Sequence, residues 1–166
     1  MRNLVICMLA LALALTGCQQ VAQKATEKAV EQATGVQVSQ RGDTVSVKGK
    51  DGESYTFGSQ TPDELKNFPV PQGFNADQGG GAGVISKGNE KMAMASWKGT
   101  GNVQSVSDYY KKIMVDQGWT QEMAQDLGDM AQLSYTKAQD HAVVTISKAD
   151  QNVTVQVLFS NTAKNQ

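Results

Sequence analysis

The residue with the clearest chemical role in this 166-residue sequence is a cysteine, Cys18, which directly follows two small residues, Thr16 and Gly17. An apolar run over residues 4–15 comes before them, and Arg2 precedes the run. A positive start, a short apolar run and small residues before a cleavage point are the features of a secretory signal, and the run is too short to span a bilayer. The segment therefore indicates an exported chain with a thiol placed where an acyl chain can be attached.

The four residues Leu15–Cys18 resemble the lipobox of bacterial lipoproteins. This resemblance implies cleavage between Gly17 and Cys18, a diacylglycerol on the Cys18 sulfur, and a further fatty acyl chain such as palmitate on its amine. Two or more chains hold a protein on a bilayer stably, whereas one chain does not. Gln19 rather than Asp follows the cysteine, which resembles an outer-membrane address in a host with two membranes, with the domain facing the periplasm. The alternative is an ordinary secretory signal with a chance cysteine.

Catalytic chemistry has little support in the sequence. His141 is the single histidine, so a Ser-His-Asp relay must pass through it, but no Gly-x-Ser-x-Gly segment supplies a nucleophile. A solvated strand end is the favoured interpretation of His141. Cys7 leaves with the signal and Cys18 carries lipid, so the mature chain has no thiol for catalysis, a disulfide or a zinc site. We expect a non-enzymatic protein without a cofactor.

Three other groups could bind something. Asp126 and Asp129 flank Gly128 and could hold calcium, but the EF-hand spacing is absent and a polar turn is favoured. Trp97 and Trp119 could form a platform for a sugar or a peptide, although tryptophans at strand positions more often lie in a core. The glycine-rich run over residues 79–83 is not followed by Gly-Lys-Ser/Thr and does not match a phosphate loop. The sequence predicts no metal site.

Composition limits the class of protein. The formal net charge is −1 at pH 7 and 40% of the residues are hydrophobic. This charge gives no footprint for nucleic acid, so no nucleic-acid partner is expected. Removal of residues 1–17 would leave 149 residues, enough for one domain with its own core.

The elements that must position these residues begin with a tether. Residues 19–34 are rich in Ala, Gln, Lys and Glu, with alanines at helical spacing, and favour a frayed helical tether; a self-associating helix is the alternative. A β meander follows over residues 36–57, where Val, Tyr and Phe alternate with polar residues. Its turns fall at residues 41–43, which spell Arg-Gly-Asp, and at 50–52, where Asp-Gly favours a hairpin. We interpret Arg-Gly-Asp as a turn and not as an adhesion motif.

The second half of the mature chain combines a short helix, an extended strip, a hairpin, a long helix and further strands. Thr61 is expected to cap one or two helical turns, and residues 68–71 (Phe-Pro-Val-Pro) must be extended. The long helix is expected over residues 105–118 with Ser105 as its cap. Its apolar stripe comprises Val106, Tyr109, Tyr110, Ile113 and Met114. Gly118 should end it, and the strands after Trp119 should pair antiparallel with the stripe on one face.

A Val-rich meander with Asp-Gly turns, a Phe-Pro-Val-Pro strip, and a Tyr-Tyr…Gly-Trp helix module ahead of three strands resemble a group of small bacterial lipoproteins of unknown function. The predicted fold class is α+β: an N-terminal β meander followed by a mostly antiparallel sheet with one main amphipathic helix on a face. The expected organisation is a signal peptide at 1–17, a lipidated tether at 18–34, a single domain at 35–160 and a disordered tail at 161–166. The group offers no catalytic residues to carry over.

Three functional classes remain open. The first is a lipid-anchored, non-catalytic module that binds an unidentified envelope protein; the second is a purely structural envelope lipoprotein; the third is a hydrolase. For a partner site, loops are the candidates because core strands are used in packing. The residues predicted to contact a partner are Phe68, Pro69, Pro71, Gly79, Gly81, Gly83 and Trp97.

The anchor gives a direct prediction. Cys18→Ser removes the thiol that would carry the lipid, so we expect the protein to leave the membrane fraction or to accumulate with residues 1–17 uncleaved. Cell fractionation and the mass of the N-terminus measure both outcomes. A variant that is processed and remains membrane-bound like the original chain would show that Cys18 is not the anchor.

Overall fold

The structure is a computed structural model that describes residues 36–49 and 52–162. The signal segment with Gly17, the lipidation residue Cys18, the tether and the Lys50–Asp51 part of the second turn lie outside the described residues. The strands are β1 (Gln37–Arg41), β2 (Thr44–Lys48), β3 (Ser54–Gly58), β4 (Asn75–Ala76), β5 (Ala82–Lys87), β6 (Glu90–Gly99), β7 (Thr120–Asp126), β8 (Met130–Lys137), β9 (Asp140–Ala149) and β10 (Asn152–Thr162). The helices are the short 3-10 helix η1 (Asp63–Leu65) and the α-helix α3 (Val103–Asp116).

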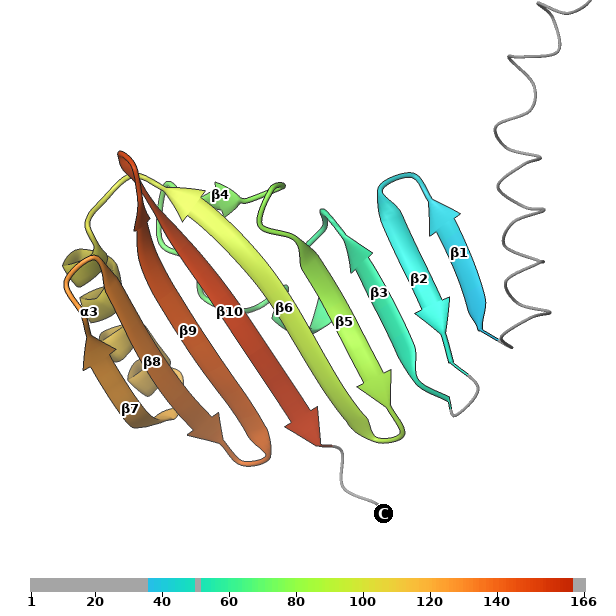
Figure 1. Ribbon diagram of the computed structural model, residues 1–166. Helices are drawn as coiled ribbons and strands as arrows, with labels where there is room; N and C mark the ends of the chain where they lie inside the picture. The colour runs from blue at the N-terminus through green and yellow to red at the C-terminus, as the bar shows by residue number, and fades with distance from the viewer. Residues whose placement is uncertain (1–35, 50–51, 163–166) are drawn as a thin grey trace, which may run out of the picture.

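All ten strands belong to one antiparallel sheet, with α3 packed on one of its faces (Figure 1). The strand order is β1-β2-β3-β5-β6-β10-β9-β8-β7, and β4 pairs with the end of β6. α3 connects β6 to β7, and the meander β7–β10 then returns so that β10 lies beside β6. The expected α+β class, a mostly antiparallel sheet with one helix on a face, is confirmed. Of the helices in the described residues, none is long and apolar enough to cross a membrane.

The hairpin turns explain why the strands pair in this order. Gly42 lies between β1 and β2 with a φ of 61°, and Gly88 lies between β5 and β6 with a φ of 57°. Arg-Gly-Asp is thus a hairpin turn, as expected. Ala138 and Asp150 adopt the same left-handed conformation between β8 and β9 and between β9 and β10. Short left-handed turns match the twist of the strands that they join, so neighbours along the chain pair directly.

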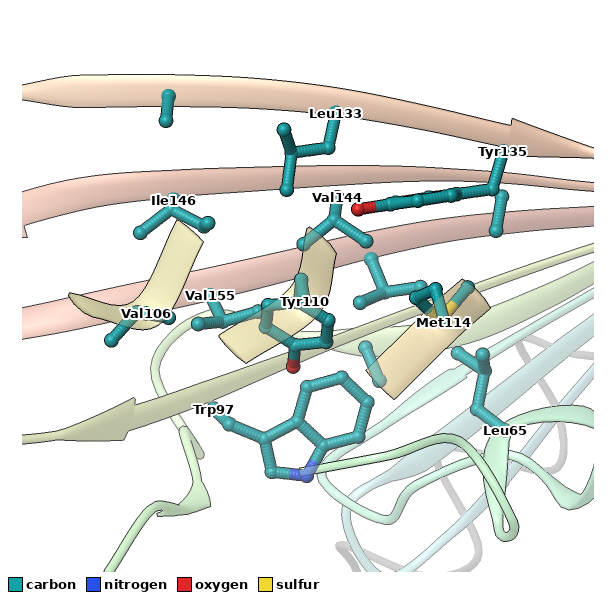
Figure 2. Packing of buried hydrophobic residues seen from close by; sticks show 14 of the residues in the cluster. Leu65, Trp97, Val106, Tyr110, Met114, Leu133, Tyr135, Val144, Ile146 and Val155 are labelled. Carbon is teal, nitrogen blue, oxygen red and sulfur yellow. The ribbon is translucent and has the colours of Figure 1, made fainter. Parts of the chain in front are cut away.

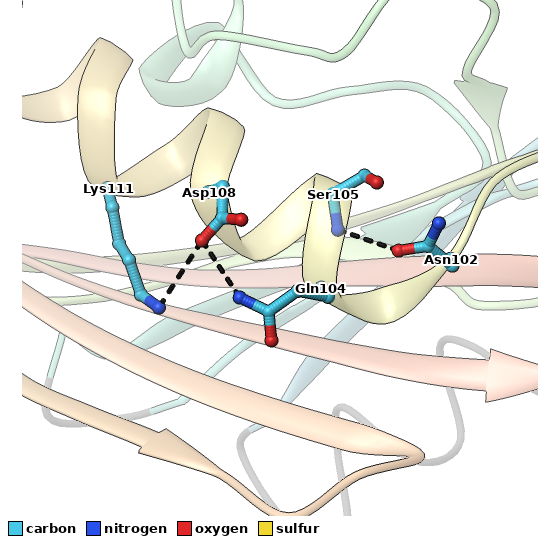
Figure 3. Close-up of polar contacts among 5 residues, drawn as sticks. All are labelled: Asn102, Gln104, Ser105, Asp108 and Lys111. Carbon is cyan, nitrogen blue, oxygen red and sulfur yellow. Dashed lines mark hydrogen bonds and ion pairs between the residues drawn. The ribbon is translucent and has the colours of Figure 1, made fainter.

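The start of α3 differs from the sequence prediction. The helix begins at Val103, and Asn102 is its cap: the Asn102 Oδ1 atom accepts a hydrogen bond of 2.8 Å from the Ser105 backbone N–H (Figure 3). Ser105 was therefore the wrong cap, because the side-chain oxygen that satisfies the first free N–H groups comes from three residues earlier. Asp108 sits on the exposed side of the first turns, where Gln104 donates to it at 2.9 Å and Lys111 pairs with it at 3.6 Å.

The face of α3 that meets the sheet is also rotated from the predicted stripe. Val106, Tyr110 and Met114 are buried as expected (Figure 2). Val103 and Ser107 complete the buried face. Tyr109 and Ile113 are only partly buried at its edge. Because the helix starts earlier, Val103 lies three residues before Val106 on the same side of the helix. The side of α3 that contacts the sheet is therefore centred closer to Val103 and Ser107 than the predicted stripe. Opposite α3, the core side of the sheet carries Ala131, Leu133, Tyr135, Ala142, Val144, Ile146, Val153, Val155 and Val157.

The end of α3 follows the prediction. Gly118 has a φ of 81°, and the Trp119 N–H donates to the Met114 carbonyl at 3.0 Å. Lys137 on β8 donates to the Gln117 carbonyl at 2.8 Å, which satisfies another free acceptor of the last turn. The chain then enters β7, whose pairing with β8 shifts register between Gln121 and Met123.

The rotated helix face can be tested with two neighbouring residues. Met114 is fully buried whereas Val115 is 54% exposed. Met114→Ala should therefore lower the free energy of unfolding by about 2–5 kcal/mol, because it removes buried apolar atoms and leaves a cavity. Val115→Ala should change it by less than about 0.5 kcal/mol. Ile113→Ala should fall between the two. Chemical denaturation measures all three, and equal losses at Met114 and Val115 would contradict this packing.

Candidate functional site

A strap over residues 68–74 crosses the side of α3 and closes the core there. The Tyr110 hydroxyl donates to the Pro69 carbonyl at 3.0 Å, and the Tyr109 hydroxyl donates to the Val70 carbonyl at 3.3 Å. The two prolines fix the extended backbone whose carbonyls accept these bonds. The paired tyrosines of the helix therefore serve to hold the strap.

The strap brings aromatic side chains onto the core. The Phe68 ring stacks on Trp97 with centroids 6.5 Å apart and also lies 6.2 Å from Tyr110. Burial raises the pKa of Tyr110 well above its ordinary value, so this hydroxyl remains a donor to Pro69 throughout the physiological range. Phe74 covers Gly99 on β6, where an added Cβ would lie 2.4 Å from the ring. These contacts make the strap part of the core packing.

The short helix before the strap is η1, which begins after Pro62 without the side-chain cap expected from Thr61.

The residues predicted to contact a partner do not share one environment. Trp97 is 5% exposed and belongs to the core, and Pro71 is buried. Phe68 and Pro69 are partly buried, because they take part in the contacts between the strap and the core. Gly79 and Gly81 are exposed in the loop before β5, and Gly83 is buried within β5. Partner contact by these residues stays a prediction.

The glycine-rich loop is a hydrogen-bonded turn. The Gly79 N–H donates to the Asp77 side chain at 3.1 Å, the Gly80 N–H donates to the Asp77 carbonyl at 3.0 Å, and the Asp77 N–H donates to the Ser96 carbonyl at 2.8 Å. Gly80 lies so close to Ser96 that an added Cβ would come within 2.6 Å of its side chain. The glycines therefore allow the loop to pack on β6, and Asp77 anchors it there.

Two rows of side chains cross the face of the sheet opposite α3, and we call them together the outer strip. Side chains of directly paired residues lie on the same face of a sheet, so the strand register defines each row. The first row contains Val45, Phe57, Gly83, Met94, Leu158 and Val143. The second row contains Val38, Val47, Tyr55, Ile85 and Met92. Phe57 is 43% exposed, Met92 41% and Leu158 39%, so the described residues leave much of this strip open to solvent.

The outer strip exists because the apolar side of the sheet changes face along its width. In β7–β10, the fully buried apolar residues point to α3, and most residues that point away are polar, such as Thr145 and Gln156. In β2 and β3, the polar residues point to the α3 side instead; Ser46 and Thr56 share a 3.2 Å hydrogen bond there. The alternation of Val45, Val47, Tyr55 and Phe57 was visible in the sequence. Its assignment to the uncovered face was not, because that depends on long-range register.

Gly83 has a specific role in the strip. The ring of Phe57 lies over it from the paired position on β3, and a Cβ added at Gly83 would come within 2.7 Å of that ring. The absence of a side chain on β5 lets the ring lie down across the strand instead of standing away from the sheet. Phe57 thus fills the gap between Val45 and Met94, and the first row is continuous from β2 to β9.

Two buried hydroxyls lie in the interface between α3 and the sheet. Ser107 on α3 and Tyr135 on β8 are each 1% exposed, and neither side-chain oxygen has a hydrogen-bond partner among the described residues. Burial raises the pKa of the Tyr135 hydroxyl to about 12. A buried hydroxyl without a partner carries a desolvation cost, so each of these two atoms could accept or donate a hydrogen bond to a polar group.

The residues considered for catalysis or metal binding are dispersed. His141 is exposed on β9, opposite Ser160 and Thr136, and neither neighbour is acidic. Asp126 accepts a hydrogen bond of 3.0 Å from the Gly128 N–H, which makes the segment a polar turn, and Asp129 pairs with Lys148 at 3.7 Å. Within residues 36–49 and 52–162, no group of His, Cys, Asp or Glu is arranged to hold a metal ion.

Surface hollows in the described part of the chain are open to solvent. One of about 330 Å³ lies at the start of α3 beside Asn102, Asp129 and Lys148. Another of about 530 Å³ lies between Glu64, Lys91 and Phe159, where Lys91 and Glu64 pair at 3.1 Å. Ion pairs of this kind at exposed sites contribute little and fit a solvated surface. The outer strip and the α3–sheet interface remain as the two candidate sites.

Comparison with known proteins agrees with this architecture. A family model described as START domain-like matches residues 76–158, which is half of the chain. The matched part covers the end of β4, the hairpin β5–β6, α3 and all but the last residues of the returning meander β7–β10. No curated protein and no solved structure matches the chain. The match covers half of the chain and agrees with the helix packed on an antiparallel sheet. The chain therefore belongs to the START domain-like family.

Proposed function

We propose that this protein is a lipid-anchored, non-catalytic module of the cell envelope that binds a protein through the outer strip. The observation that carries the proposal is the open apolar surface on the sheet. Phe57, Met92 and Leu158 come from three different strands, yet they lie on one face and each exposes about two-fifths of its surface. Contiguous apolar surface of this kind on a folded domain marks an interaction site.

The N-terminal meander has a defined part in this proposal. β1, β2 and β3 add little to the core under α3, because their polar side chains point toward it. Their apolar side chains extend the sheet surface away from α3 and supply most of the second row. We infer that the meander serves to build the outer strip, and that membership in the START domain-like family is consistent with a binding role.

The anchor would keep this surface near a membrane. Residues 19–35 lie between the lipidated cysteine of the proposal and the described domain. A flexible chain of about 17 residues has an end-to-end distance of about 20–25 Å. A partner on the same membrane would therefore stay within reach of the outer strip, whether that membrane is the outer or another envelope membrane. A purely structural lipoprotein would use the same anchor but would not need an open apolar strip.

A hydrolase is disfavoured by the surroundings of His141. Its paired neighbours are Ser160 and Thr136, so the cross-strand positions supply hydroxyls but no carboxylate to orient the imidazole. The exposed position of His141 on β9 also lies outside the core and the strap. The proposal therefore assigns no catalytic residue.

The binding surface can be tested by photo-cross-linking in membranes. A photo-reactive aromatic amino acid in place of Phe57 should form adducts with an envelope protein, because this position is exposed within the outer strip. The same amino acid in place of Val115, which is 54% exposed on α3, is the control and should give few adducts. Immunoblots of the irradiated membranes measure the yield. Equal yields at the two positions, or none at Phe57, would argue against the outer strip as the site.

The α3–sheet interface supports a second candidate function, binding of a small ligand. The START domain-like match suggests a ligand-binding module, and the unpartnered hydroxyls of Ser107 and Tyr135 lie within the matched residues. Both are surrounded by apolar side chains, so a ligand there would be mainly apolar with one or two polar atoms. This candidate does not exclude the first, because the two sites lie on opposite faces of the sheet.

The Tyr135→Phe variant tests whether that hydroxyl has a partner in solution. Without one, removal of the hydroxyl should leave the free energy of unfolding unchanged or raise it by about 1–3 kcal/mol. A loss of stability would instead show that a water molecule or a ligand occupies the site.

The same variant should alter the response to alkaline pH. The pKa of Tyr135 is about 12 in the folded chain and 10.0 ordinarily. Its contribution to stability is thus complete below pH 10 and is lost as the pH rises from 10 to 12, because only the unfolded chain releases the proton there. Denaturation across this range should show a shallower decline for Tyr135→Phe than for the original chain.

A further inference from the structure

The outer strip raises the question of which protein surface could cover it. Strands with one apolar and one polar side normally pack the apolar side against another layer. For β7–β10 that layer is α3 and, for β5 and β6, the strap. For the apolar side of β1–β3, the described residues provide no such layer, since Phe57 is 43% exposed.

The dimensions of the strip fit the centre of a modest protein interface. It runs from β1 to β9, across six strand spacings of about 4.8 Å, so it is ~29 Å long. Its two rows lie two residues apart along each strand, about 6.6 Å, which gives an apolar area on the order of 200 Å². Specific complexes bury about 800 Å² on each partner, with an apolar centre and a polar rim. The strip has the size of such a centre.

The charges beside the strip disfavour an anionic lipid surface as the occupant. Lys87 pairs with Glu53 at 2.6 Å and lies opposite Glu90 in the ladder between β5 and β6. This edge thus carries two carboxylates for one ammonium group. Attraction to an anionic bilayer requires clusters of Lys and Arg. An edge that carries charges of both signs is compatible with a protein surface that does the same.

The shape of the strip favours a second sheet. A wide antiparallel sheet has a right-handed twist, and two sheets with the same twist stack face to face about 10 Å apart with a rotation of about −30°. A second copy of this chain has the required twist, the required apolar rows and the same rim. A two-fold axis would place each strip on the other and close the assembly, because an isologous contact uses the same surface on both copies.

We propose that the outer strip is the interface of a homodimer in which two sheets stack face to face through β1–β3, β5, β6 and β10. The dimer rests on the proposed function in one respect, the lipid anchor. Anchors would hold the copies in one membrane and raise their effective concentration, so a small interface is enough to hold the dimer together. The second copy is then the protein that binds the strip, and the α3 faces lie on the two outer sides of the assembly.

A matched pair of methionines tests the interface in the full-length protein. Met92 on β6 lies in the strip and is 41% exposed; Met130 on β8 lies on the same face of the sheet outside the strip and is 39% exposed. Two full-length copies with different epitope tags are produced together and cross-linked in membranes with formaldehyde. One tag is captured, and recovery of the other is measured. Met92→Asp in both copies should lower recovery by about tenfold, because an unpaired carboxylate enters an apolar contact. Met130→Asp should change it by less than about twofold.

A second pair keeps the test independent of one substitution. Leu158→Glu lies in the strip, and Leu127→Glu lies in the turn between β7 and β8; these side chains are 39% and 63% exposed. Melting curves of all four variants identify any that fail to fold. The dimer is overturned if the original chain shows no recovery of the second tag, or if the strip variants and their controls lose recovery equally. If the Phe57 probe still forms an adduct with a different protein in that case, the proposed function stands and only the homodimer falls.

Discussion

The ladder between β6 and β10 is the constraint on which the rest of the structure depends. It pairs Glu90 with Thr162 at one end and Gly99 with Val153 at the other, and it joins the part of the sheet that α3 covers to the part that leads to β1–β3, whose apolar side faces the opposite way. Along β10, Val153, Val155 and Val157 point to the core under α3 while Leu158 points to the outer strip. Because successive side chains alternate between faces, a shift of one residue in this ladder would exchange the two surfaces. The fold and its candidate binding face are therefore set by the same register.

Close packing on both faces depends on small residues at particular positions. Gly99 on the α3 side allows the Phe74 ring of the strap to lie against β6, and Gly83 on the other side allows the Phe57 ring to lie across β5. An added Cβ would meet the ring at 2.4 Å in the first case and 2.7 Å in the second. An aromatic ring over a strand glycine compensates for the side chain that the glycine lacks, and at Gly83 it also pins the register of β3 and β5. The same pairing thus fixes the strap on one face and completes the outer strip on the other.

Local patterns in the sequence were sufficient for most elements. Alternation predicted the strands of the meander over residues 36–57, and Gly118 marked the end of the helix, because both signals depend on residues close in the chain. The helix cap was misplaced because Asn102 and Ser105 are both good caps, and only the hydrogen bond from the Ser105 N–H distinguishes them. The candidate site was harder to predict. Trp97 and Phe57 are both aromatic residues on alternating strands, yet one is 5% exposed and the other 43%, since their environments depend on the strap and on pairing with Gly83. No local pattern records either contact.

Separation of the two surfaces has a consequence for how binding could be regulated. The α3 face and the outer strip share β6 and β10, so a change in the spacing of these strands reaches both. The α3 face is dense, with Tyr110, Leu133, Val144 and Ile146 nearly inaccessible to solvent, and dense interiors transmit strain instead of absorbing it. A ligand that bonded Ser107 or Tyr135 would act on α3 and β8, at the far end of the sheet from β1–β3. Coupling would then have to pass through β9, β10 and β6, the strands with the longest ladders in the sheet. Coupling through such strands requires two discrete arrangements, and their continuous pairing provides only one register. We therefore expect the two surfaces to bind independently unless the ligand alters that register.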